Sequence, residues 1–96
     1  LIELSDPSEP TVRNLAIWMQ RQARAQVEKK PEWKISILGP APCPIKKIQG
    51  RYRYQLLVKS ERGGAAAPFA KWLVERTSEQ APKASIRLNV DPYRFM

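Results

Sequence analysis

Apolar and polar positions follow two different periods along the chain, and each period predicts one kind of element. Residues 12–29 carry apolar side chains three and four positions apart, which is the spacing of an amphipathic helix, and residues 65–78 show the same spacing. Four other segments alternate apolar and polar side chains or pack apolar ones closely, as strands do. These are residues 1–4, 34–38, 51–59 and 85–91.

The resulting order of strand, helix, strand, strand, helix, strand is that of the split βαβ, or ferredoxin-like, α+β fold. Residues 5–11 supply capping side chains and prolines that suit the start of the first helix, and Pro31 ends it. We expect one four-stranded antiparallel sheet with the first and third strands central and both helices on one face. The side chains expected to be buried together are Leu15, Met19, Trp72 and Leu73.

The predicted strand at residues 51–59 has two unlike faces, because successive side chains point to opposite sides of a sheet. One face holds Tyr52, Tyr54, Leu56 and Val58, of which at least one tyrosine is expected in the core. The other face holds Arg51, Arg53, Gln55, Leu57 and Lys59. Before this strand, the alternating prolines of residues 39–44 predict a stiff, extended connector without hydrogen-bond donors at the proline positions.

Composition excludes several classes of function. The 96 residues suit a single domain, and 43% hydrophobic with 27% charged residues is an ordinary globular balance. The absence of histidine excludes His-based nucleophilic chemistry, and the lone Cys43 excludes an internal disulfide and suits a reducing compartment. No apolar run is long enough to span a membrane. We therefore expect no catalysis by this chain alone, and its start at Leu1 suggests a piece of a longer protein.

Charge supplies the positive indication of function. Seventeen Lys and Arg against nine Asp and Glu give a net charge of +8, which favours a polyanionic partner, with nucleic acid ahead of membrane or acidic protein. Between residues 46 and 62, six basic residues face one acidic residue, Glu61, so this segment alone carries +5. The alternative to a binding role is that this segment is simply a basic loop exposed to solvent. The six are Lys46, Lys47, Arg51, Arg53, Lys59 and Arg62.

Three motifs resemble the C-terminal domain of the PriA family of bacterial replication-restart helicases. They are Gly-Pro-Ala-Pro-Cys-Pro-Ile at residues 39–45, Gly-Arg-Tyr-Arg-Tyr-Gln-Leu-Leu-Val-Lys at 50–59 and Val-Asp-Pro at 90–92. The sequence departs from the family pattern at Cys43, where alanine is common, at Tyr54, where tryptophan is common, and at Asn89. The resemblance covers the chain in element order and makes residues 1–96 one C-terminal DNA-binding domain, similar in fold to a small-subunit ribosomal protein.

The resemblance also implies a parent and its partners. The parent would be an ATP-dependent 3′→5′ DNA helicase of the bacterial cytoplasm and nucleoid, with ATP, magnesium and zinc bound only by other domains. Its partners would be single-stranded and branched DNA, the single-stranded DNA-binding protein, other primosome proteins and the helicase core of the same chain. No membrane is implied. For the acidic tail of the single-stranded DNA-binding protein, Arg62 is the nearest candidate.

The residues predicted to bind DNA lie in and around the third strand. The basic side chains would neutralise phosphates without reading sequence, and Tyr52 would stack on an unpaired base. The candidates are Lys46 and Lys47, on an expected loop, with Arg51, Tyr52, Arg53, Gln55, Lys59 and Arg62. In a docking domain, the alternative, Arg51 or Arg53 would instead pair with acidic groups of the helicase core. An RNA-recognition sheet is disfavoured because residues 1–4 lack an aromatic side chain.

Overall fold

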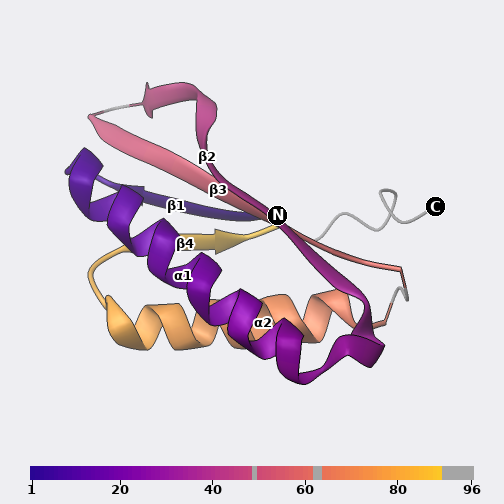
Figure 1. The fold of residues 1–96 in the computed structure, drawn as a ribbon. Helices are drawn as coiled ribbons and strands as arrows, with labels where there is room; N and C mark the ends of the chain where they lie inside the picture. Colours follow the sequence, from indigo (N-terminus) through magenta and orange to yellow (C-terminus); the bar gives the residue numbers. More distant parts are fainter. Residues whose placement is uncertain (49, 62–63, 90–96) are drawn as a thin grey trace.

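The computed structural model describes residues 1–48, 50–61 and 64–89, and for residues 44–48 it describes the backbone alone. The elements follow the predicted order, with one short 3-10 turn, η1, added after the first helix (Figure 1). They are β1 (Ile2–Asp6), α1 (Glu9–Lys29), η1 (Pro31–Trp33), β2 (Ile35–Ile48), β3 (Arg51–Ser60), α2 (Ala66–Gln80) and β4 (Ser85–Leu88). The α+β, ferredoxin-like prediction is confirmed.

The four strands form one antiparallel sheet in the order β2-β3-β1-β4, so β1 and β3 are central as predicted. Ile2 of β1 pairs with Leu56 of β3 on one side and with Leu88 of β4 on the other. Both helices lie on the same side of the sheet (Figure 1). The fold is therefore a two-layer structure, and the described residues leave the other face of the sheet open.

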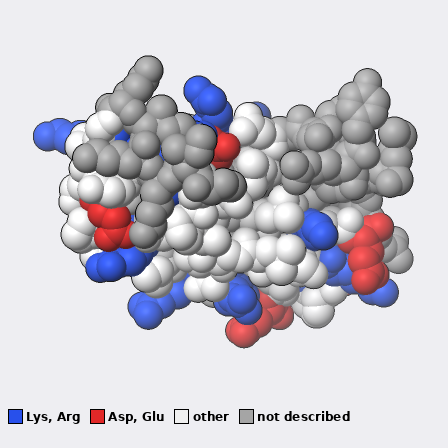
Figure 2. All heavy atoms as spheres, turned by 90° about the horizontal axis from the view of Figure 1, so that it is seen from above, with Lys and Arg blue, Asp and Glu red and all other residues white. Residues whose placement is uncertain are grey.

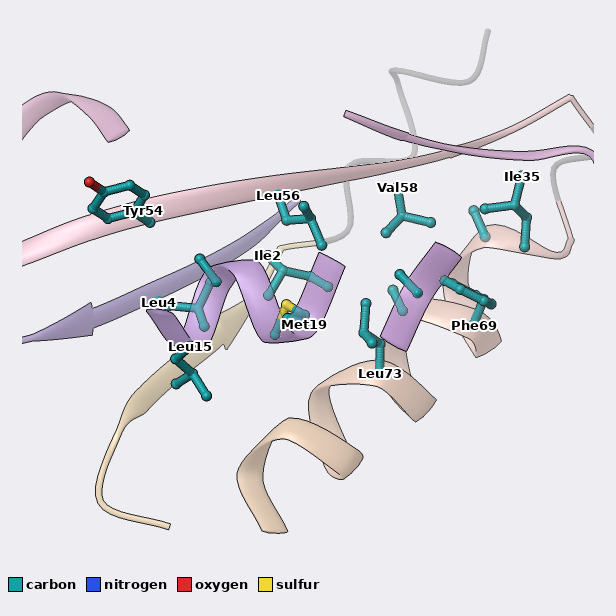
Figure 3. Packing of buried hydrophobic residues seen from close by; sticks show 14 of the residues in the cluster. Ile2, Leu4, Leu15, Met19, Ile35, Tyr54, Leu56, Val58, Phe69 and Leu73 are labelled. Atoms are coloured by element: carbon teal, nitrogen blue, oxygen red, sulfur yellow. The ribbon is translucent and has the colours of Figure 1, made fainter. Parts of the chain in front are cut away.

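One hydrophobic cluster fills the space between the sheet and the helices (Figure 3). Its fully buried side chains come from β1, α1, β3 and α2, and the largest of them are Ile2, Leu4, Met19, Leu56 and Leu73. Leu15 is also buried, as expected. Trp72 is only half-buried, because it lies beside the stripe through which α2 meets the sheet. Its ring packs on Phe69 with the centroids 5.7 Å apart, so the expectation that Trp72 is buried with the other three residues was wrong, although it packs against the core.

The first helix begins at Glu9, three residues earlier than the hydrophobic stripe indicates. Ser8 caps it: the Ser8 hydroxyl oxygen accepts hydrogen bonds from the backbone N–H and the hydroxyl of Thr11. Pro10 fits the first turn because the N–H that it lacks would have no partner there. The capping signal before the helix was thus correct, and the start of the helix lies closer to it than the apolar stripe suggests.

The second strand corrects two predictions. β2 runs on through the proline-rich segment, so the connector expected at residues 39–44 was wrong. Among the described strands, β2 lies at the edge of the sheet and pairs with β3 alone, and its register shifts between Leu38 and Ala41 and again between Pro42 and Lys47. Prolines are tolerated at such an edge because their missing donors face away from the ladder. Lys46 and Lys47 belong to this strand, not to the expected loop.

In β4, the described strand ends at Leu88, and residues 90–91 of the predicted strand lie outside the described residues.

Candidate nucleic-acid interface

The open face of the sheet carries the basic side chains of β3. Tyr54, Leu56 and Val58 are buried beneath the helices, so the residues between them point to the other side. Arg51, Arg53 and Gln55 are half-buried on this open face, and Lys59 is exposed. The structure therefore brings these four predicted residues together on one surface.

Arg51 is held in place by neutral groups. Its Nε donates to the Ser5 hydroxyl oxygen at 3.2 Å, and its Nη2 donates to the Ser5 carbonyl oxygen at 3.1 Å. Both acceptors belong to β1, the neighbouring strand of the sheet. These bonds orient the guanidinium without cancelling its charge, and this leaves a fixed cation on the open face.

Arg53, two residues further along β3, is paired with a charged group instead. Its Nη2 lies 2.5 Å from Glu3 Oε2 of β1, with 27% of the arginine and 19% of the glutamate side chain exposed. The hydrogen bond that Arg53 donates to Glu3, followed by the negative charge of Glu3, raises the pKa of the Arg53 guanidinium above its ordinary value. Arg53 is thus a permanent cation whose charge is compensated within the domain.

A third arginine completes a groove on this face. Arg87 of β4 lies directly across from Glu3 in the β1–β4 register. The groove has a volume of about 330 Å³ and is lined by Glu3, Leu4, Ser5, Arg51, Arg53, Ser85 and Arg87. Three arginines and one glutamate give this lining a net charge of +2. Such a groove offers guanidinium groups to an anion at the centre of an otherwise open sheet face.

Sequence reasoning missed Arg87, because it stands alone in a short strand far from the basic segment. One signal was available: Ile86 and Leu88 alternate with Ser85 and Arg87, which puts Arg87 on the polar face of its strand. Combined with the predicted central position of the first strand, this alternation would have placed Arg87 on the same face as Arg53.

Cys43 of β2 lies near Arg53, and its surroundings disfavour the reactive thiolate. Its thiol donates to Gln55 Oε1 at 3.8 Å, and its side chain is buried. Burial is the largest cause that raises the pKa of the Cys43 thiol; the charge of Arg53 opposes this and that of Glu3 adds to it. Because the thiolate is the reactive form, a raised pKa disfavours reaction, and we interpret Cys43 as a small packing group.

The remaining predicted residues are not brought into the groove. Tyr52 is half-buried on the helix side of β3, where it packs against the core, and Tyr54 is buried on the same side. The Tyr54 hydroxyl donates to Glu9 Oε2 of α1 at 2.5 Å. Of the other candidates, the side chains of Lys46 and Lys47 and all of Arg62 lie outside the described residues.

Across residues 1–48, 50–61 and 64–89, no group of three or more His, Cys, Asp or Glu side chains is placed to hold a metal ion. Neither of the two described α-helices combines the length and the apolar character needed to cross a membrane.

Comparison with known proteins shows which family this chain is similar to. The family model of the primosomal protein N C-terminal domain matches residues 1–93. The chain is similar to the replication restart protein PriA of Bacillus subtilis (strain 168), with 31% identity over 62 residues, which is 62% of this chain and 8% of that protein. It is also similar to the replication restart protein PriA of Rickettsia felis, with 31% identity over 75 residues, which is 76% of this chain and 11% of that protein. The chain thus spans only a small part of the length of these relatives.

Proposed function

The chain belongs to the family of primosomal protein N C-terminal domains, and from this membership we propose that it is the DNA-binding module of a replication-restart helicase. The relatives are named for replication restart, and their matched segments are a minor part of their length. The proposed parent is an ATP-dependent 3′→5′ helicase that acts at stalled or branched forks in the bacterial cytoplasm. In this proposal the domain contributes binding of DNA, and the chemistry belongs to other parts of the parent.

The observation that carries the proposal is the arginine-lined groove on the open face of the sheet. Arg51 presents an uncompensated charge there, and Arg53 and Arg87 lie beside it. A guanidinium group can donate two parallel hydrogen bonds to the oxygens of one phosphate. Because every nucleotide has the same phosphate, this contact does not depend on the base sequence. A module that must act at any fork needs binding of this kind.

The proposed contacts extend from the groove along β3. Lys59 and Gln55 share the open face with Arg51 and Arg53, and Gln55 would donate a hydrogen bond to a phosphate or a sugar. Lys46 and Lys47, near the end of β2, and Arg62, which follows β3 in the sequence, would add positive charge. Tyr52 lies on the helix side of β3, so its stacking on a base would take place away from the groove.

The test is a titration of the 96-residue chain with labelled single-stranded, duplex and forked DNA, followed by fluorescence anisotropy across a salt series. Four phosphate contacts on a single strand predict a slope of about −3 for log affinity against log salt, at ~0.7 per contact. Raising the salt from 50 to 200 mM would then weaken binding about 60-fold. Absence of binding to all three DNAs at low salt would refute the proposal.

A second candidate function is a docking domain that braces the helicase core and presents a site for the single-stranded DNA-binding protein. It is favoured by the edge of β2, where Leu38 is 50% exposed and residues 35–43 carry no charge. Figure 2, seen from the side on which β2 lies in Figure 1, shows a largely uncharged stretch of the described surface with both basic and acidic atoms around it. A salt slope near zero would favour docking over DNA binding.

A further inference from the structure

Glu3 lines the arginine groove from β1, the strand between β3 and β4, and has an arginine neighbour on each of those two strands. Its carboxylate is paired with Arg53 of β3, and its register partner on β4 is Arg87. Residues directly opposite on antiparallel strands have Cβ atoms about 5 Å apart, so the Arg87 side chain is within reach of the same carboxylate. The acidic group therefore lies where a bound anion would lie.

The two arginines of β3 differ in whether a phosphate must displace the group that each of them already contacts. Arg51 bonds to the neutral Ser5 and can accept a phosphate while it keeps those bonds through its other donors. Arg53 bonds to Glu3, and a carboxylate and a phosphate compete for the same fork of donors. Both members of the Arg53–Glu3 pair keep part of their side chains exposed, 27% for Arg53 and 19% for Glu3, so a phosphate arriving from solvent can reach the pair.

We propose that Glu3 is an internal competitor for DNA: its carboxylate occupies Arg53 in the free domain, and a phosphate of the DNA strand displaces it on binding. This inference rests on the proposed DNA-binding function and adds a regulatory element to it. Arg87 receives the displaced carboxylate, so that no charge is left unpaired in the groove. The Glu3 carboxylate would weaken DNA binding equally for all base sequences. This suits a module that must release one fork before it acts at another.

The test compares Glu3→Gln with Glu61→Gln in the same anisotropy titration on a single-stranded oligonucleotide. Both variants remove one negative charge, but Glu61 is exposed and contacts Lys34 at 3.8 Å, away from the groove. Glu3→Gln is expected to bind about fivefold tighter than wild type, because its neutral amide no longer competes with phosphate for the Arg53 guanidinium. Its salt slope should be steeper by somewhat under one unit. Glu61→Gln should change affinity less than about twofold.

A double-mutant cycle separates competition from general repulsion. In an Arg53→Ala background, Glu3→Gln should lose its advantage over Glu61→Gln, because the charge for which Glu3 competes is gone. The second variant is Glu3→Ser, which replaces the carboxylate with a neutral hydroxyl like that of Ser5, the partner of Arg51. It should raise the affinity for the oligonucleotide as much as Glu3→Gln does. Circular dichroism checks that each variant is folded.

The outcomes distinguish the inference from the function on which it rests. If wild type binds with a steep salt slope but Glu3→Gln and Glu61→Gln bind alike, the competitor is refuted and DNA binding stands. An equal gain from Glu3→Gln with and without Arg53 also refutes the competitor, because it indicates repulsion at a distance. If no DNA binds to wild type, the proposed function is refuted and the competitor with it.

Discussion

Tyr54 links β3 to the start of α1 through a single hydrogen bond. Its hydroxyl donates to Glu9 Oε2 at 2.5 Å, and its ring is buried in the core. Tyr54→Phe removes the donor and leaves the Glu9 carboxylate with Arg13, 3.5 Å away. Because a hydrogen bond to a charged group is lost while Glu9 keeps access to solvent, we expect a loss of about 1–2 kcal/mol in the free energy of unfolding. Urea denaturation followed by circular dichroism measures it, and an unchanged midpoint would contradict the role given to this bond.

The same hydrogen bond gives stability a pH dependence. The bond to Glu9, then burial and then the Glu9 charge, raise the pKa of Tyr54 in the folded state. An unfolded tyrosine titrates near pH 10, so above about pH 10 the unfolded chain releases this proton before the folded one does. The contribution of Tyr54 is therefore fully present below that pH and is lost as the pH rises through the folded-state value. We expect the difference in stability between wild type and Tyr54→Phe to narrow above pH 10.

At the scale of single residues, the sequence predicted on which face of the sheet a side chain lies but not which side chain it contacts. Alternation along β3 assigned Arg51 and Arg53 to one face and Tyr54 to the other, and the structure agrees. The partners of the arginines could not be read from the sequence, because Ser5 and Glu3 are about fifty positions away. Such contacts depend on the register between β1 and β3, which hydrophobic pattern alone does not specify to the residue.

At the scale of elements, the β2–β3 hairpin depends on Gly39. Its φ of +102° is in the region that L side chains rarely adopt, and an added Cβ would lie 2.9 Å from the carbonyl oxygen of Gln55. Gly39→Ala should therefore lower the free energy of unfolding by about 1–3 kcal/mol, since backbone atoms must move. Thermal unfolding by circular dichroism measures the loss.

Gly64, just before α2, provides the matched control for this substitution. An added Cβ at Gly64 meets nothing within 4 Å, so Gly64→Ala should leave the unfolding temperature close to that of wild type. Equal unfolding temperatures for Gly39→Ala and Gly64→Ala would show that the close approach at Gly39 is not a constraint on the hairpin.

The elements also differ in how well pattern predicted them. Both helices were located to within a few residues, because a buried stripe and a break or a cap define a helix locally. β2 was taken to be much shorter than it is, since prolines ordinarily exclude a strand. They are compatible with β2 because the strand lies at the sheet edge, and edge position is a property of the whole sheet that no local pattern contains.

At the scale of the whole molecule, two basic surfaces lie on opposite sides of the core. The open face of the sheet bears Arg51 and Arg53, and the helix layer bears the exposed Arg21 and Arg24 of α1. Net charge alone attracts DNA to either side, so composition predicted a polyanionic partner without predicting a binding face. The fold separates the two surfaces, because both helices cover the same side of the sheet (Figure 1).

Arg51→Ala and Arg24→Ala remove the same charge from these two sides. If DNA lies on the open face, Arg51→Ala should flatten the salt slope for a single strand by about 0.7, the share of one phosphate contact, while Arg24→Ala leaves the slope unchanged. Arg51 also bonds to Ser5, so thermal unfolding must show that the variant is folded at the temperature of the titration. Anisotropy across a salt series measures both slopes. The reverse result, a flatter slope for Arg24→Ala alone, would place the DNA on the helix layer, because the number of phosphates neutralised depends on which face the strand follows.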